Sequence, residues 1–80
     1  MKVEWRPAAR KAFLRLPAAD QTAIQDKLER YVETGAGDVT RLVGATALRL
    51  RHRDWRVIFE VEDGILVVRV AHRSVAYRQR

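Results

Sequence analysis

The stretch LRLRHRDWRVIFEV, residues 48–61, decides the fold of this 80-residue chain. Arginine stands at every second position (49, 51 and 53), and side chains two residues apart share one face of a β-strand. Leucine at positions 48 and 50 occupies the opposite face. The pattern therefore predicts a strand over 47–53 with one apolar face and one cationic face. A short turn at Arg53-Asp54 leads into a second strand over 54–61.

Two further strands are expected on either side of this stretch. KVEW (Lys2–Trp5) reads as a short first strand, and ILVVRVAHR (65–73) reads as the last one. The residues EDG (Glu62–Gly64) form a short hairpin connection between the last two strands. The β-branched residues in VIFEV and ILVVRV support both strands.

The residues between the first strand and position 47 have helical rather than strand periodicity. Pro7 suits the first turn of a helix, and an apolar stripe continues to about Leu16. LPAAD interrupts this stripe, and a second helix runs to about Thr34, where Gly35 is a stop signal. GAGDVTRLVGAT (35–46) is expected to be a connecting loop. The apolar stripes on both helices are interpreted as core.

The element order β-α-α-β-β-β predicts a single α+β domain over residues 1–80. A helical hairpin packs on one face of a small, mainly antiparallel sheet. Leu48 and Leu50, with alternating residues of the last two strands, then face the helices. The arginines at 49, 51 and 53 point to the other face, and Arg69 and Arg73 share a parity on the last strand. The uncovered face of the sheet is therefore expected to be positively charged.

The composition agrees with a small globular domain that binds an anionic partner. Hydrophobic residues make up 48% of the chain, there is no cysteine, and the net charge is +6. Residues 47–80 carry eight cations against four acidic residues, and all eight are arginine, whose planar fork of donors suits phosphate. No signal-type segment or membrane-spanning apolar run is found, so a cytoplasmic location is expected.

Several motifs together resemble the RelE/ParE superfamily of toxins from type II toxin–antitoxin pairs. They are the RLP at Arg15–Pro17, the RLVG at Arg41–Gly44, the segment LRLRHRDWRVIFEVEDGILVVRVAHR and the closing Tyr77. The resemblance covers nearly the whole chain and implies a RelE-like fold. In this superfamily the RelE branch cleaves messenger RNA in the ribosomal A site, and the ParE branch poisons DNA gyrase. An antitoxin that wraps the toxin holds either branch inactive.

Similarity to the RelE branch, the closer of the two, implies a metal-free endoribonuclease. The ribose 2′-OH attacks the adjacent phosphate, and preorganised cations stabilise the charge that gathers on the phosphorus oxygens. The residues that match the family's catalytic positions are Arg49, Arg56, Arg73 and Tyr77. Contacts to the RNA are expected from Arg51 and Arg53, which suit the phosphate backbone, and from Trp55, which either stacks on a base or belongs to the core.

The general base is left unassigned by this resemblance. RelE has a second basic residue at the position of Ala47, and arginine itself hardly deprotonates. His72 and His52 are the candidate bases, because histidine titrates in the useful range and some family members use a histidine close to position 72. Simple alternation, however, turns His72 away from Arg73. An ordinary strand-end or turn histidine is the alternative for both.

The sequence offers little support for other chemistries. Two histidines without cysteine do not make a zinc site, and no P-loop or dinucleotide motif is present. The sequence therefore predicts a ribosome-dependent messenger RNA endoribonuclease without metal or cofactor, neutralised by a cognate antitoxin. The alternatives are a ParE-like gyrase inhibitor without nuclease activity and a non-catalytic basic module that binds nucleic acid.

Overall fold

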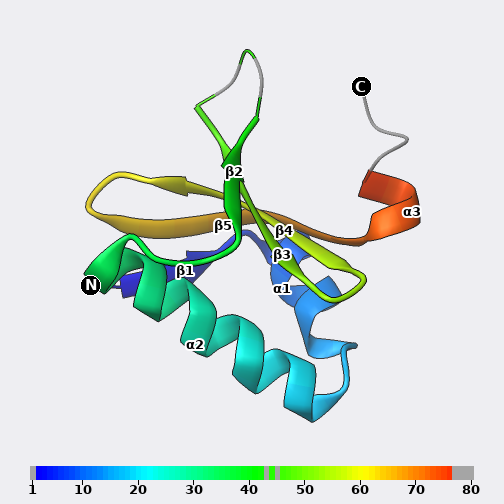
Figure 1. Cartoon of the computed structure of the whole chain (residues 1–80). Coiled ribbons are helices and arrows are strands. Elements are labelled where there is room, and N and C mark those ends of the chain that lie inside the picture. Colours follow the sequence, from blue (N-terminus) through cyan, green and yellow to red (C-terminus); the bar gives the residue numbers. More distant parts are fainter. Residues whose placement is uncertain (1, 43, 45, 77–80) are drawn as a thin grey trace.

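The computed structural model describes residues 2–42, 44 and 46–76, and it confirms the α+β fold with a helical hairpin on one face of a sheet (Figure 1). Its elements are β1 (Lys2–Trp5), α1 (Pro7–Leu14), α2 (Ala18–Thr34), β2 (Val39–Arg41), β3 (Leu48–His52), β4 (Trp55–Val61), β5 (Gly64–His72) and α3 (Arg73–Ala76).

The strands form one five-stranded sheet in the order β1-β5-β4-β3-β2. Strand β1 runs parallel to β5, and the other neighbours are antiparallel. Arg51 lies directly opposite Arg56 across β3 and β4, and Ile58 lies opposite Arg49 on one side and Arg69 on the other. Because directly opposed residues point to the same face, this register decides which side chains gather.

Both long helices lie on one side of the sheet (Figure 1), where α1 packs on β5 and α2 packs on β3 and β5. The alternating apolar residues of the strands point into this layer. Phe59 on β4 is fully buried there, and its ring packs edge to face with that of Tyr31 of α2, with 5.7 Å between ring centroids. The core therefore lies between the helices and the sheet, and neither long helix covers the opposite face, which we call the open face.

Three local predictions are wrong. The segment expected to be a loop contains β2, a short edge strand that pairs with β3 and extends the sheet by one strand. The last strand ends at His72, and Arg73 begins the short helix α3. Arg53 does not share the open face, because it lies in the turn after β3 with a positive φ of 55° and its guanidinium reaches Asp20 of α2.

A candidate anion-binding face

Four arginines lie on two neighbouring rows of the open face. One row runs Arg49, Ile58 and Arg69 across β3, β4 and β5, and the next runs Arg51, Arg56 and Ala71. Arg49 and Arg51 were placed on this face by sequence alternation, and the structure confirms that placement. Arg69 was not among the expected site residues, because only the register of β4 against β5 brings it beside the others.

Arg51 and Arg56 differ in exposure although they are directly opposed. The side chain of Arg51 is 61% exposed, and its Nε lies 3.1 Å from a carboxylate oxygen of Asp38, the residue before β2. Arg56 is only 4% exposed, and its Nη1 donates hydrogen bonds to the backbone carbonyls of Arg53 and Trp55 at 2.8 and 2.9 Å. Arg56 is therefore held against the turn between β3 and β4, whereas Arg51 extends into solvent.

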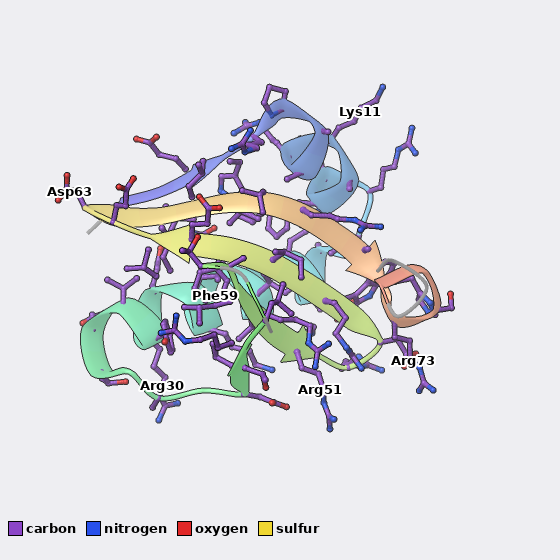
Figure 2. The ribbon with its side chains drawn as sticks, turned by 90° about the horizontal axis from the view of Figure 1, so that it is seen from above. Lys11, Arg30, Arg51, Phe59, Asp63 and Arg73 are labelled. Atoms are coloured by element: carbon purple, nitrogen blue, oxygen red, sulfur yellow. The ribbon has the colours of Figure 1, made fainter. Side chains whose placement is uncertain are left out.

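Arg73 lies at the same end of the sheet as Arg51, opposite the end that carries Asp63 (Figure 2). Its backbone N–H donates to the carbonyl of Asp54 at 2.7 Å, and its guanidinium lies 3.8 Å from the carboxylate of the same residue. The start of α3 is therefore joined to the β3–β4 turn. Tyr77, the remaining residue expected from the family motif, lies outside the described residues.

The opposite end of the open face is acidic. Glu4 of β1, Leu66 of β5 and Glu60 of β4 lie side by side in register, next to the β4–β5 turn that carries Asp63. A pocket of about 380 Å³ opens among these residues. The face thus changes from negative to positive along the strands, and an anion is attracted to the end where the arginines gather.

Trp55 and His72 lie opposite each other on the helix-covered side of the sheet, not on the open face. Their rings meet edge to face with 5.4 Å between centroids, and Trp55 packs against the core. His72 is exposed, and its Nδ1 lies 3.1 Å from the hydroxyl oxygen of Ser74. These positions favour the core interpretation of Trp55 and the strand-end interpretation of His72, as the alternation of side chains predicts.

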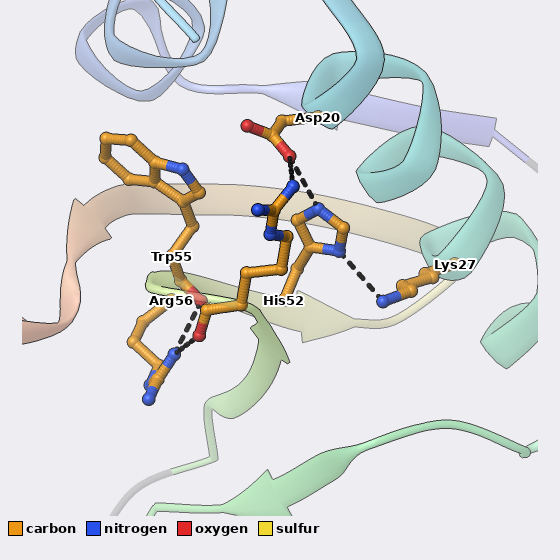
Figure 3. Close-up of polar contacts among 6 residues, drawn as sticks. Asp20, Lys27, His52, Trp55 and Arg56 are labelled. Atoms are coloured by element: carbon orange, nitrogen blue, oxygen red, sulfur yellow. Dashed lines mark hydrogen bonds and ion pairs between the residues drawn. The ribbon is translucent and has the colours of Figure 1, made fainter. Parts of the chain in front are cut away.

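His52, the second candidate base, is buried with 6% exposure between two residues of α2 (Figure 3). Its Nε2 lies 2.9 Å from Oδ1 of Asp20, and its Nδ1 lies 2.8 Å from Nζ of Lys27. Arg53 lies 3.8 Å from the same oxygen of Asp20. Sequence reasoning missed this set, although Asp20 and Lys27 are seven residues apart and so share one helix face.

The geometry gives the open face one chemical capacity, the binding of phosphate-like anions. Guanidinium groups offer several N–H donors in a plane, which matches the oxygens of a phosphate. Arg51 and Arg73 are exposed enough to reach a ligand in solution. In the described part of the chain, no three His, Asp or Glu side chains are grouped as a metal site requires.

Comparison with known families places the chain in one of them. Residues 3–77 match the family described as "ParE toxin of type II toxin-antitoxin system, parDE". The match spans almost the entire sequence, so the protein belongs to this toxin family, within the RelE/ParE superfamily. No curated protein matches the chain.

Solved structures show the same fold at low sequence identity. The RelB–RelE antitoxin–toxin complex from Methanococcus jannaschii matches with a TM-score of 0.75 and 20% identity, covering 94% of this chain and 95% of the other. A YoeB/ParE toxin from Agrobacterium tumefaciens matches with a TM-score of 0.75 and 19% identity, covering 90% and 98%. The intact RelBE complex from E. coli gives 0.73 and 18%, covering 88% and 93%. None of the described helices has the length and apolar character that crossing a membrane requires.

Proposed function

We propose that this toxin is a metal-independent endoribonuclease that cleaves messenger RNA in the ribosomal A site. The observation that carries the proposal is the direct opposition of Arg51 and Arg56, next to the row that holds Arg49 and Arg69. Like charges opposite each other in a sheet are destabilising, so their gathering favours an anionic ligand over a purely structural role. The four arginines are a candidate binding face for the phosphates of RNA.

The proposed reaction is attack of a ribose 2′-OH on the adjacent phosphorus. The P–O5′ bond breaks, and the products are a 2′,3′-cyclic phosphate and a 5′-OH. Arg49, Arg56 and Arg73 are proposed to stabilise the negative charge that develops on the phosphoryl oxygens. Arg51 on the open face and Arg53 in the adjoining turn, whose side chain is 77% exposed, are proposed to hold the RNA backbone, which positions the substrate without reading its sequence.

Proton transfer in the proposed reaction requires a group that accepts the proton of the 2′-OH. Tyr77 is proposed to act near the scissile phosphate, as its match to the family motif implies. His72 stays a candidate base, because its exposed ring stands at the end of β5, directly before Arg73 in sequence. A poor base suffices where the ribosome itself orients the 2′-OH for in-line attack.

An antitoxin is the proposed protein partner. The solved relatives from Methanococcus jannaschii and Pyrococcus horikoshii are RelB–RelE and RelE–RelB complexes. We propose that the cognate antitoxin places an acidic segment over the arginines of the open face, which blocks the approach of RNA. The charge of these arginines supports the idea, since a carboxylate competes for the same donors as a phosphate.

The decisive experiment maps RNA ends after brief induction of the toxin in cells. We expect new 5′-OH ends within translated messages, and we expect Arg73→Ala to lower their yield by about 100-fold, the effect of removing one charge-stabilising donor. Arg56→Lys is the companion variant, because it keeps a cation at a buried position whose bonds to the turn also support the fold.

Arg30→Ala is the matched control, since it removes one exposed arginine from α2, away from the open face. It should leave both cleavage and growth arrest unchanged. Unaltered cleavage in Arg73→Ala and Arg56→Lys together would contradict the nuclease assignment.

Inhibition of DNA gyrase is the second candidate, favoured by the match to the family described as the ParE toxin and by the YoeB/ParE relative. Such a toxin acts by binding and has no need of a cleavage site. Induction would then produce DNA breaks and an SOS response without new 5′-OH ends in RNA. The same induced culture tests both candidates.

A further inference from the structure

A network of polar side chains lies on the helix-covered side of the sheet, behind the arginines of the open face. Its centre is the buried ring of His52, which bridges Asp20 and Lys27 on one face of α2 (Figure 3). Asp20 is 8% exposed and also lies 3.8 Å from the guanidinium of Arg53. This network therefore connects α2 to the end of β3 and to Arg53, the first residue of the β3–β4 turn.

The two contacts of the His52 ring determine which of its nitrogens carries the hydrogen. A lysine ammonium only donates, so Nδ1 of His52 accepts from Lys27. Nε2 then carries the hydrogen and donates to the carboxylate of Asp20. A flipped ring would place the ring carbons against both partners, and the other tautomer would place an N–H against the lysine ammonium, so only one arrangement of the ring satisfies both contacts.

His52 is also next to the backbone that holds Arg56. It is the last residue of β3, and it lies opposite Trp55, the first residue of β4. The turn between them offers the carbonyls of Arg53 and Trp55 to Nη1 of Arg56. The ring thus anchors to α2 the residue from which this turn begins, and the carbonyls of the turn hold the guanidinium of Arg56, whose side chain belongs to the opposite face of the sheet.

We propose that His52, together with Asp20 and Lys27, is a positioning residue that sets the guanidinium of Arg56 for contact with phosphate. The proposal rests on the proposed function, in which Arg56 stabilises the reacting phosphoryl group. A leucine would fill the same space without the cost of burying polar atoms. The polar network instead holds the surrounding residues in one conformation, since fully satisfied buried networks rigidify the residues around them.

The test is a double-mutant cycle on cleavage by purified toxin of messenger RNA on ribosomes. His52→Leu should lower the single-turnover cleavage rate by about tenfold or more, the scale expected for a displaced catalytic group, with little change in affinity for the ribosome. In the Arg56→Lys background the same substitution should have almost no further effect, because interacting residues are not additive. Lys27→Met, at an exposed position, should weaken cleavage in the same direction without risk to the core.

Ile65→Val is the control for a general loss of stability, because Ile65 is buried near the start of β5, far along the strand from His52. Independent effects of His52→Leu and Arg56→Lys would overturn the proposal. So would a loss of cleavage in His52→Leu no larger than that in Ile65→Val.

A second measurement separates this proposal from the nuclease assignment. The side-chain N–H signals of Arg56, observed by ¹⁵N NMR in the isolated toxin, should shift and exchange faster in His52→Leu and in Lys27→Met. Unchanged Arg56 signals in both variants would overturn the positioning role. Absence of cleavage by the unmodified toxin, with the signals shifted as expected, would overturn the nuclease function and leave the positioning of Arg56 supported.

Discussion

Arg53 adopts a backbone φ of 55° in the two-residue turn that joins β3 to β4. Hairpin turns of this length need positive φ, which glycine and asparagine accept and β-branched residues resist. The turn therefore sets the direction of the Arg53 side chain, and strand alternation does not. The side chain lies near Asp20 of α2 and not beside the arginines of the open face.

This conformation makes a prediction for the stability of the fold. Arg53→Val should destabilise the protein by about 1–2 kcal/mol relative to Arg53→Asn, because valine is strained in the left-handed region and asparagine is not. Both variants lose the same contact to Asp20, so the comparison isolates the backbone. Urea unfolding of the two variants measures the difference, and equal midpoints would show that the turn relaxes.

Alternation predicted the faces of Arg49 and Arg51 correctly, since both lie inside a regular strand. It failed at Arg53, where the strand had already ended. The burial of Arg56 could not be read from the sequence either, because its bonds to the turn carbonyls depend on where the turn places them. The faces of Arg49 and Arg51 were thus predictable from the sequence, whereas the position of Arg53 and the burial of Arg56 were not.

At the scale of the elements, α2 ends where the sequence predicts. Gly35 caps it with φ 74°, and its N–H donates to the carbonyl of Tyr31 at 2.8 Å. Apart from its chain neighbours, the described residues have no heavy atom within 4 Å of the position that a Cβ would occupy there. The helix end therefore needs glycine for its backbone conformation and not for lack of space.

Gly35→Ala should accordingly destabilise the protein by about 1 kcal/mol, the cost of a left-handed alanine. Gly35→Asn should cost less, because asparagine tolerates this region. Thermal unfolding by circular dichroism compares the two variants with the parent chain. A stability unchanged by alanine would mean that the last turn of α2 rearranges freely.

Strand β2 shows why the pairing of strands could not be predicted from the sequence. Its three residues are too few to display alternation, and the bond from the N–H of Arg51 to the carbonyl of Asp38 is visible only in the fold. The register of β4 against β5 is also irregular between Ile58 and Phe59, which is what places Arg69 beside Ile58. The types of the elements could be predicted from periodicity. Which arginines share the open face could be seen only from the register of β3, β4 and β5.

At the scale of the whole molecule, the net charge of +6 should make binding to single-stranded RNA strongly dependent on salt. Arg51→Ala should reduce the slope of log affinity against log salt concentration by about 0.7, the value for one phosphate contact on a single strand. Fluorescence anisotropy with a labelled oligonucleotide measures both slopes. Arg30→Ala should leave the slope unchanged, and equal losses in the two variants would indicate diffuse binding without a defined face.

The parallel pairing of β1 with β5 has a consequence for biosynthesis. Lys2 lies opposite Gly64, and Trp5 lies opposite Val67, so the edge of the sheet joins segments from distant parts of the chain. Contacts of such long sequence separation form late and slowly in folding. A nascent chain cannot complete the sheet until residue 67 has left the exit tunnel, so the folded toxin forms only after most of the chain has been synthesised.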